Sequence, residues 1–146
     1  MVTAIVAVLG TLAGSLMTGV LQHYSQRTAR RLARQDEQLD AVAALVGALT
    51  EHRRAMWTRE HLRMQGADWE AARTESHRTR SAITIPLLRL QLLVPALADT
   101  AHVAAHATYA LRGAWESGET GLAARREHAI TKTDDLVTAV GHHFAA

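Results

Sequence analysis

Nine histidines make a metal site the first chemistry to consider in this chain. Asp99, His102 and His106 lie at i, i+3 and i+7, so one face of a helix would present all three side chains. Two histidines four residues apart can chelate zinc, and a neighbouring carboxylate can complete such a site. A catalytic H-E-x-x-H helix would need glutamate at position 103, which is Val103. A polar helix surface explains the same residues without a ligand, and we therefore expect neither a bound metal nor a cofactor.

A second group of side chains could contact phosphates. Seven arginines occur between residues 53 and 80, around what we interpret as the first helical hairpin: Arg53, Arg54, Arg59, Arg63, Arg73, Arg78 and Arg80. Arginines bind DNA phosphates without reading the base sequence, and the first four are the candidate contacts. Glutamates are interleaved with these arginines, which is typical of solvated helix faces with local ion pairs. DNA contact is therefore the alternative interpretation.

Catalytic motifs are absent from the sequence. It contains no phosphate-binding G-x-x-x-x-G-K-[ST], no dinucleotide-binding G-x-G-x-x-G and no G-x-S-x-G nucleophile motif. The lack of cysteine excludes disulfides, thiolate metal sites and cysteine nucleophiles. Asp134 and Asp135 fit a helix surface better than an acid–base pair. A net charge of only +2 indicates no globally basic surface. We expect that the protein is not an enzyme.

An apolar segment at the N-terminus organises the rest of the chain. Residues 2–21 contain no charged side chain, and a helix of this length is about 30 Å long, the thickness of the hydrocarbon core of a bilayer. We predict a transmembrane span over residues 1–24. The alternatives are a cleaved signal peptide, which would have a basic residue before the apolar run, and a buried soluble helix.

The residues that follow this segment and the faces of its helix are both informative. Four arginines follow it and would lie against anionic lipid, which places the N-terminus outside and the body in the cytoplasm: Arg27, Arg30, Arg31 and Arg34. Small residues share one side of the predicted span and would let two helices approach closely: Ala7, Gly10, Gly14 and Thr18. The frequency of glycine in membrane helices is the competing explanation. We expect a homo-oligomer in the cell membrane.

The remaining residues, 25–146, read as one all-α domain. Heptad-like spacing from Leu32 to Met56 predicts a long helix over 25–65, in which Leu39 and Val42 also belong to the apolar stripe. Gly66 fits its C-cap and Asp68 the N-cap of a helix over 68–93. Two further helices are expected at 95–112 and 121–144. Nothing alternates like a strand, so the chain is expected to form a bundle of about four helices.

Two prolines lie in the second apolar stretch, residues 81–98. Pro86 predicts a kink or break, and Pro95 fits the first turn of the next helix. Arg89 near the centre of this stretch would cost about 2.5 to 3.5 kcal/mol in a bilayer, so a helical hairpin in the soluble core is favoured over a second span. A contact of residues 81–98 with the membrane stays open.

Several segments together resemble a known family. They are IVAVLGTLAGSLMTGVLQH at 5–23, HRRAMWTRE at 52–60, TRSAITIPL at 79–87, ATYALRG at 107–113 and LAARREHAI at 122–130. These resemble the KilB-like proteins of actinomycete, chiefly streptomycete, conjugative elements. The resemblance implies a small membrane-associated protein that assists transfer or spread of plasmid DNA beside a separate DNA translocase, with no catalytic residues carried over.

We therefore expect a membrane-anchored helical assembly protein that assists plasmid transfer by oligomerising and recruiting other transfer proteins. The alternative is a membrane-tethered, non-specific DNA-binding module that uses the arginines of the first hairpin.

Overall fold

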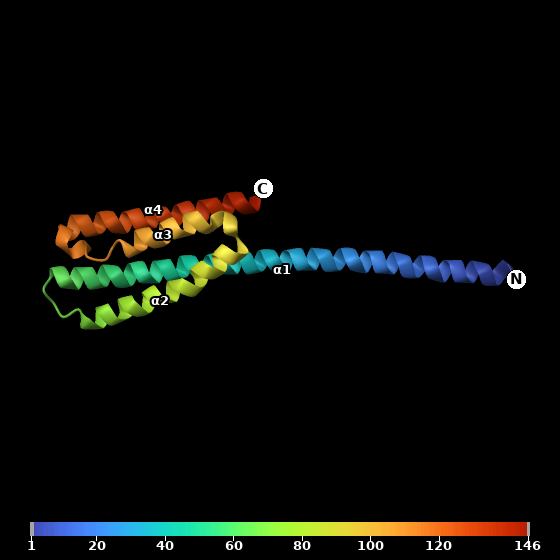
Figure 1. The fold of residues 1–146 in the computed structure, drawn as a ribbon, viewed down its shortest axis with the longest axis horizontal. Coiled ribbons are helices and arrows are strands. Elements are labelled where there is room, and N and C mark those ends of the chain that lie inside the picture. Colours follow the sequence, from blue (N-terminus) through green and yellow to red (C-terminus); the bar gives the residue numbers. More distant parts are fainter. Residues whose placement is uncertain (1, 146) are drawn as a thin grey trace. The chain divides into compact units, whose positions relative to one another are not determined.

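The computed structural model describes the backbone of residues 2–145 and the side chains of residues 27–145. Over this range it is helical and contains no strand, so the all-α prediction is confirmed. The elements follow one another in a simple order (Figure 1): α1 (Val2–Met64), α2 (Glu70–Leu93), the 3₁₀ turn η1 (Pro95–Leu97), α3 (Ala98–Tyr109), the 3₁₀ turn η2 (Ala114–Ser117) and α4 (Gly118–Ala145).

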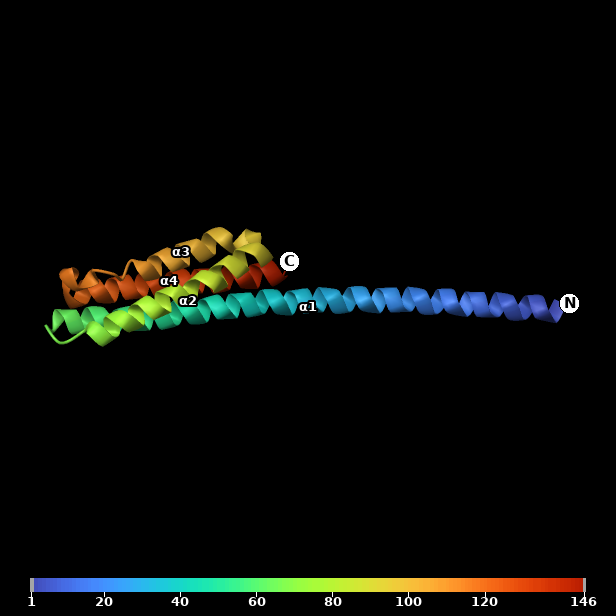
Figure 2. The ribbon, with the colours of Figure 1, turned by 60° about the horizontal axis from the view of Figure 1, so that its bottom comes forward.

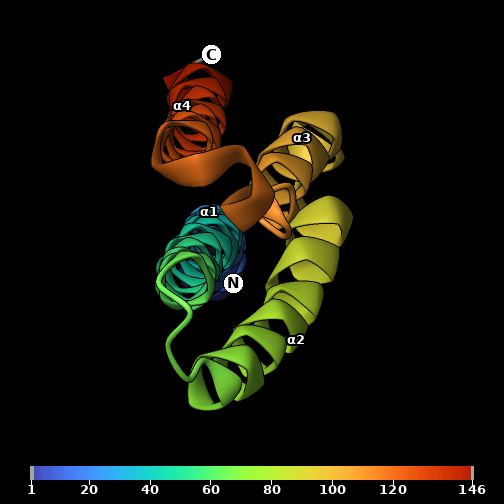
Figure 3. The same ribbon diagram turned by 90° about the vertical axis from the view of Figure 1, so that its left-hand side faces the viewer.

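The chain divides into two compact units, Met1–Glu37 and Gln38–Ala146. The first unit is the N-terminal part of α1, and its described side chains, from residue 27 to residue 37, are all exposed. The second unit is a bundle formed by the C-terminal part of α1 with α2, α3 and α4. Seen end on, α2, α3 and α4 lie around this part of α1 (Figure 3).

The bundle is held together by apolar side chains from all four helices. Leu45 and Leu49 of α1, Ile83 and Leu90 of α2 and Leu136 of α4 are fully buried in one cluster. The α3 contribution is mostly alanine, which allows α3 and α4 to pack side by side (Figure 2). Because alanine buries little area, the leucines supply most of the hydrophobic stabilisation.

The apolar stripe predicted on the first helix is only partly buried. Val42 and Met56 are buried as expected, but Leu32 is 57% exposed and Leu39 is 42% exposed. The prediction was wrong at these two positions because, among the α1 side chains that are described, the first buried one is Ala41, and helical spacing alone does not reveal which turns other helices cover.

The turn between α1 and α2 follows the sequence closely. Gly66 has a φ of 65°, and the N–H of Ala67 donates to the Leu62 oxygen at 3.1 Å, the bond of a Schellman cap. Asp68 Oδ1 accepts the N–H of Glu70 at 3.0 Å. The N-cap of α2 is Trp69, however, and the helix begins at Glu70, so the N-cap predicted at Asp68 is one residue early.

The other boundaries also depart slightly from those expected. Helix α2 continues through Pro86 without a break, and Pro95 opens η1, which leads directly into α3. Helix α3 ends at Tyr109, earlier than predicted, whereas α4 starts at Gly118. Gly121, predicted as the first residue of the last helix, therefore lies within α4.

Among the residues whose side chains are described, 27–145, no helix is sufficiently long and apolar to cross a membrane. The span predicted at 1–24 lies outside that range.

Candidate functional site

The four arginines predicted to contact phosphates do not form one surface. All are on α1, but Arg53 and Arg54 line one hollow together, whereas Arg59 lines a different cleft and Arg63 lies against two tryptophan rings. Arg59 and Arg63 are four residues apart and share a face. The structure thus separates the predicted set into two sites at different sides of α1.

Arg53 and Arg54 border a shallow hollow on the α4 side of α1. Thr50, Trp57 and Arg126 also line it, and its volume is about 200 Å³. The Arg126 guanidinium lies 5.0 Å from the Trp57 ring centre. Burial lowers the pKa of Arg53, the positive charge of Arg126 lowers it further, and Asp134 opposes both effects. The hollow thus combines three cations with one aromatic ring.

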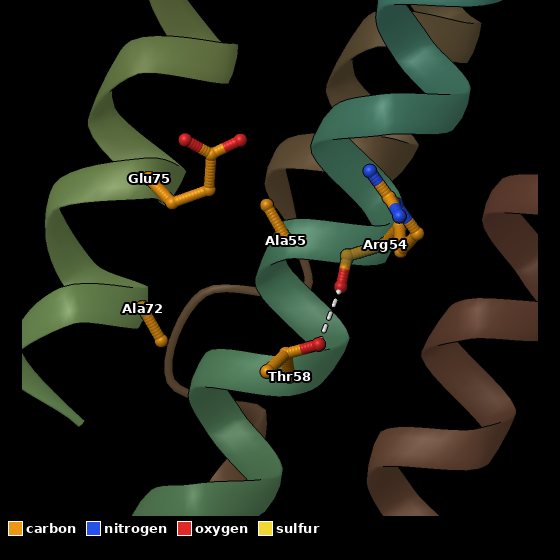
Figure 4. A pocket seen from close by; sticks show the side chains of 5 residues that line it. All are labelled: Arg54, Ala55, Thr58, Ala72 and Glu75. Atoms are coloured by element: carbon orange, nitrogen blue, oxygen red, sulfur yellow. Dashed lines mark hydrogen bonds between the residues drawn. The ribbon is translucent and has the colours of Figure 1, made fainter. Parts of the chain in front are cut away.

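A groove of about 260 Å³ lies between α1 and α2, and it is lined by Ala55, Thr58 and Ala72 together with the charged Arg54 and Glu75. Ala55 of α1 and Ala72 of α2 lie on facing sides of it (Figure 4). The Thr58 hydroxyl donates to the backbone oxygen of Arg54 at 3.2 Å, so its hydrogen is not offered to a ligand. Glu75 and Arg54 stand at opposite edges. The groove has no converging charges of one sign, and we assign it no site.

Arg59 and Glu60 form a buried ion pair that the sequence did not reveal. Their side chains are 9% and 0% exposed, and Arg59 Nε lies 3.5 Å from Glu60 Oε1. Arg59 Nη1 also donates to Ser76 Oγ at 3.3 Å, and Glu60 Oε2 accepts the backbone N–H of Trp115 at 3.4 Å. The pair therefore connects α1 to α2 and to η2, elements that are distant in sequence.

Arg63 lies between two tryptophans at the same end of the bundle. Its guanidinium carbon is 4.7 Å from the Trp69 ring centre and 4.4 Å from that of Trp115. Such cation–π contacts contribute about 0.5 to 2 kcal/mol each, depending on desolvation. The Arg63 guanidinium faces two rings, so its role in the structure is packing. Sequence reasoning assigned it to phosphate instead.

A small cationic cleft opens between α1, α2 and the end of α3. Its volume is about 110 Å³, and its walls include His52 and Arg59 of α1, Arg80 of α2, Tyr109 of α3 and Arg112 in the following turn. The Arg80 guanidinium carbon lies 4.0 Å from the Tyr109 ring centre. Three arginines from three segments thus surround one cleft. Arg80 was among the hairpin arginines noted from the sequence, but Tyr109 and Arg112 were not recognised.

His52 at the wall of this cleft is held in its neutral form. Its exposed fraction is 2%, and burial, followed by the positive charges of Arg80 and Arg59, lowers its pKa from 6.5 to about 4. His52 Nδ1 lies 3.0 Å from Thr79 Oγ1, which is itself 3.0 Å from the Glu75 backbone oxygen. The hydroxyl has one hydrogen, and donating it to the carbonyl leaves Oγ1 to accept the Nδ1–H of His52.

The weak metal candidates do not converge. Asp99, His102 and His106 are exposed on α3, and the residues described contain no group of three His, Asp or Glu side chains placed to hold a metal. His102 contacts the Gln91 amide, and the His106 ring packs against the edge of Tyr109 at 6.2 Å. Helical spacing puts these residues on one face, but the two histidine side chains have other partners.

The predicted membrane contacts are only partly within the described region. The association face of the span lies outside the described side chains: Ala7, Gly10, Gly14 and Thr18. The collar arginines lie inside it, and all four are exposed: Arg27, Arg30, Arg31 and Arg34.

An apolar stripe on α2 is exposed to solvent. Ile85, Leu88 and Leu92 are 69%, 49% and 72% exposed, and their spacing of i, i+3 and i+7 puts them on one face of the helix. Contiguous exposed apolar side chains of this kind commonly mark an interaction surface. The sequence showed an apolar stretch here but not which part of it the fold leaves uncovered.

Comparison with known proteins gives a consistent result. The model of a family described as KilB plasmid transfer protein matches residues 39–144. The chain is also 52% identical to Protein KilB of Streptomyces lividans over an alignment that covers the whole of both chains. No solved structure matches it.

Proposed function

The chain belongs to the KilB family of plasmid transfer proteins, and we propose that it is a membrane-anchored helical assembly protein that assists transfer or spread of a conjugative plasmid. The full-length match to Protein KilB is the observation that carries the role in transfer. Anchoring and assembly rest on features of the chain itself. The proposed role is non-enzymatic and works through contacts with other copies and with other transfer proteins.

The anchor in this proposal is the apolar run at residues 2–21. The exposed arginines at 27, 30, 31 and 34 support it, because basic side chains beside a span stay on the cytoplasmic side and attract anionic lipid. Each contributes about 1 kcal/mol near an anionic surface. The bundle would then lie in the cytoplasm, with the N-terminus outside.

Two surfaces support assembly. Gly10 and Gly14 would allow close contact between spans. In the bundle, the side chains of Ile85, Leu88 and Leu92 form an apolar stripe that is exposed to water. Contact with a second copy of the chain would bury this stripe, which is favourable for apolar surface. We assign this stripe to self-association of the bundle.

A transfer assay tests the anchor. A donor that expresses the chain without residues 2–21 should transfer plasmid as poorly as a donor that lacks the chain, and the shortened chain should leave the membrane fraction upon alkaline extraction. A matched variant, Leu9→Ala, keeps the apolar length and should behave like the native chain. Native transfer by a shortened chain found only in the soluble fraction would overturn the anchored role.

DNA binding is the second candidate function, and one observation favours it. The hollow at Arg53, Arg54, Trp57 and Arg126 places cations beside an aromatic ring, the combination with which proteins bind nucleic-acid strands. If this hollow binds DNA, the full chain should retard duplex DNA in a gel at low salt. The double variant Arg53→Gln/Arg126→Gln should retard it less, whereas Arg30→Gln, at an exposed position outside the hollow, should retard it like the native chain. Absence of retardation at low salt would remove this candidate.

A further inference from the structure

The cleft at the end of α3 concentrates positive charge that the fold does not neutralise. Arg59, Arg80 and Arg112 reach it from α1, from α2 and from the turn after α3, and no carboxylate is among the described residues that line it. Within the described residues, neither Arg80 nor Arg112 forms an ion pair. Glu60, the acid that contacts Arg59, is buried and also accepts the Trp115 N–H.

This arrangement is costly without an anion. Three arginines and one glutamate leave two uncompensated positive charges around a space of about 110 Å³. Burial and the neighbouring positive charges of Arg63, Arg112 and Arg73 lower the pKa of Arg59, against the opposing effect of Glu60. A bound dianion would supply the missing negative charge.

The geometry selects the size and shape of such an anion. A volume of about 110 Å³ equals that of about four water molecules, which fits a phosphate group and excludes a nucleoside. Arginine presents its N–H groups as a planar fork that bonds two oxygens of a phosphate at once. Arg80 is positioned over the Tyr109 ring and Arg59 by its bond to Ser76 Oγ. Burial raises the pKa of Tyr109, so its hydroxyl stays a donor.

We propose that this cleft binds one phosphate dianion, either free or as a terminal phosphate monoester, through Arg59, Arg80 and Arg112. The nucleoside or lipid part of a larger ligand would remain outside the cleft. Phosphate binding in this cleft is separate from the assembly proposed above, because neither the span nor the α2 stripe contributes to it.

Calorimetric titration of the full chain in neutral detergent with inorganic phosphate, at constant ionic strength, tests the proposal. Saturable binding is expected. The affinity should fall about tenfold in Arg80→Gln and about tenfold in Arg112→Gln, because each of these single variants removes one charge-assisted contact. Arg78→Gln is the matched control: it removes the same charge from the same helix, but Arg78 does not line the cleft, and native affinity is expected.

A second readout separates binding from a change in fold. In NMR titrations of the native chain, added phosphate should raise the pKa of the His52 ring, because a nearby negative charge favours the protonated ring. In the double variant Arg80→Gln/Arg112→Gln, added phosphate should leave the pKa of His52 unchanged. Vesicles of phosphatidylcholine with and without phosphatidic acid identify the source. If the native chain binds the vesicles with phosphatidic acid and the double variant does not, the ligand is a lipid phosphate. If the native chain binds inorganic phosphate but not these vesicles, the ligand is a soluble phosphate. Failure to saturate with phosphate, or equal weakening in Arg78→Gln, overturns the proposal.

Discussion

Replacement of Arg59 by methionine tests how the buried ion pair contributes to the fold. The Arg59 side chain is 9% exposed and that of Glu60 is fully buried, with 3.5 Å between Nε and Oε1. Methionine fills much of the same volume but carries no charge. Arg59→Met therefore leaves the Glu60 carboxylate in the interior, where it accepts a hydrogen bond from the Trp115 N–H.

The expected cost follows from these positions. At an effective dielectric constant of about 20, two charges 3.5 Å apart attract by about 5 kcal/mol. In the intact pair, the desolvation of both groups offsets most of this attraction. Loss of one partner leaves the other charge buried and unpaired, which should lower the free energy of unfolding by about 3 to 5 kcal/mol. Glu60→Gln added to Arg59→Met removes the stranded charge and keeps an acceptor for the Trp115 N–H. The double variant should recover about 2 to 3 kcal/mol.

Urea unfolding of the full chain, followed by tryptophan fluorescence and far-UV circular dichroism in one detergent, measures these free energies. Arg54→Met is the control, since its pair with Glu51 is 74% and 51% exposed and should contribute at most about 1 kcal/mol. Equal losses in Arg59→Met and Arg54→Met would refute the reasoning. A double variant no more stable than Arg59→Met would refute it as well.

Three further predictions concern the bundle. His52 has a lower pKa when folded, about 4, than its ordinary 6.5, so the unfolded chain gains the proton first and stability falls as pH drops from about 6.5 to 4; His52→Gln should remove up to about 3 kcal/mol of this loss in pH-dependent urea unfolding. Gly47→Ala, at an open helical position, should raise the unfolding free energy by about 0.5 to 1 kcal/mol, whereas Gly121→Ala should lower it because the new Cβ would overlap the Ser117 side chain. Leu45→Ala should cost about 2 to 5 kcal/mol, and the partly exposed Leu39→Ala about 0.5 kcal/mol in the same assay.

Local signals in the sequence were enough to place the helices. Gly66, with its positive φ, ends α1, and Pro95 opens the turn before α3, because each acts through its own backbone conformation. The start of α4 was predicted at residue 121 but lies at Gly118, because Gly113 and Gly118 both have a positive φ and the sequence does not show that the helix begins at the second of them.

The candidate site was less accessible to sequence reasoning because it depends on contacts between distant residues. Nothing local distinguishes Arg59 and Glu60, which are buried, from Arg54 and Glu51, which pair in solvent. Arg112 reaches the cleft only because α3 packs beside α1 and α2. Spacing along one helix predicted which arginines lie on the same helix face. Which arginines line the same cleft depends on how the helices pack against one another.

The span and its small-residue face stay predictions, and family membership supports plasmid transfer without testing them. Gly10→Ile and Gly14→Ile probe that face, because a bulky side chain at either position would keep two spans apart. Cross-linking of the native chain and both variants in membranes measures this. Normal oligomers in both variants would exclude assembly through the span.

Assembly at the membrane is tested most directly by cysteine cross-linking. The chain has no cysteine, so Leu88→Cys on the α2 stripe introduces one thiol that reports on that surface alone. In membranes from cells that express the full chain, a short bismaleimide should convert Leu88→Cys to covalent dimers and leave Ala123→Cys, which is exposed on α4 and not on α2, monomeric. Monomer in both variants, with both thiols shown to react, would contradict assembly through this surface.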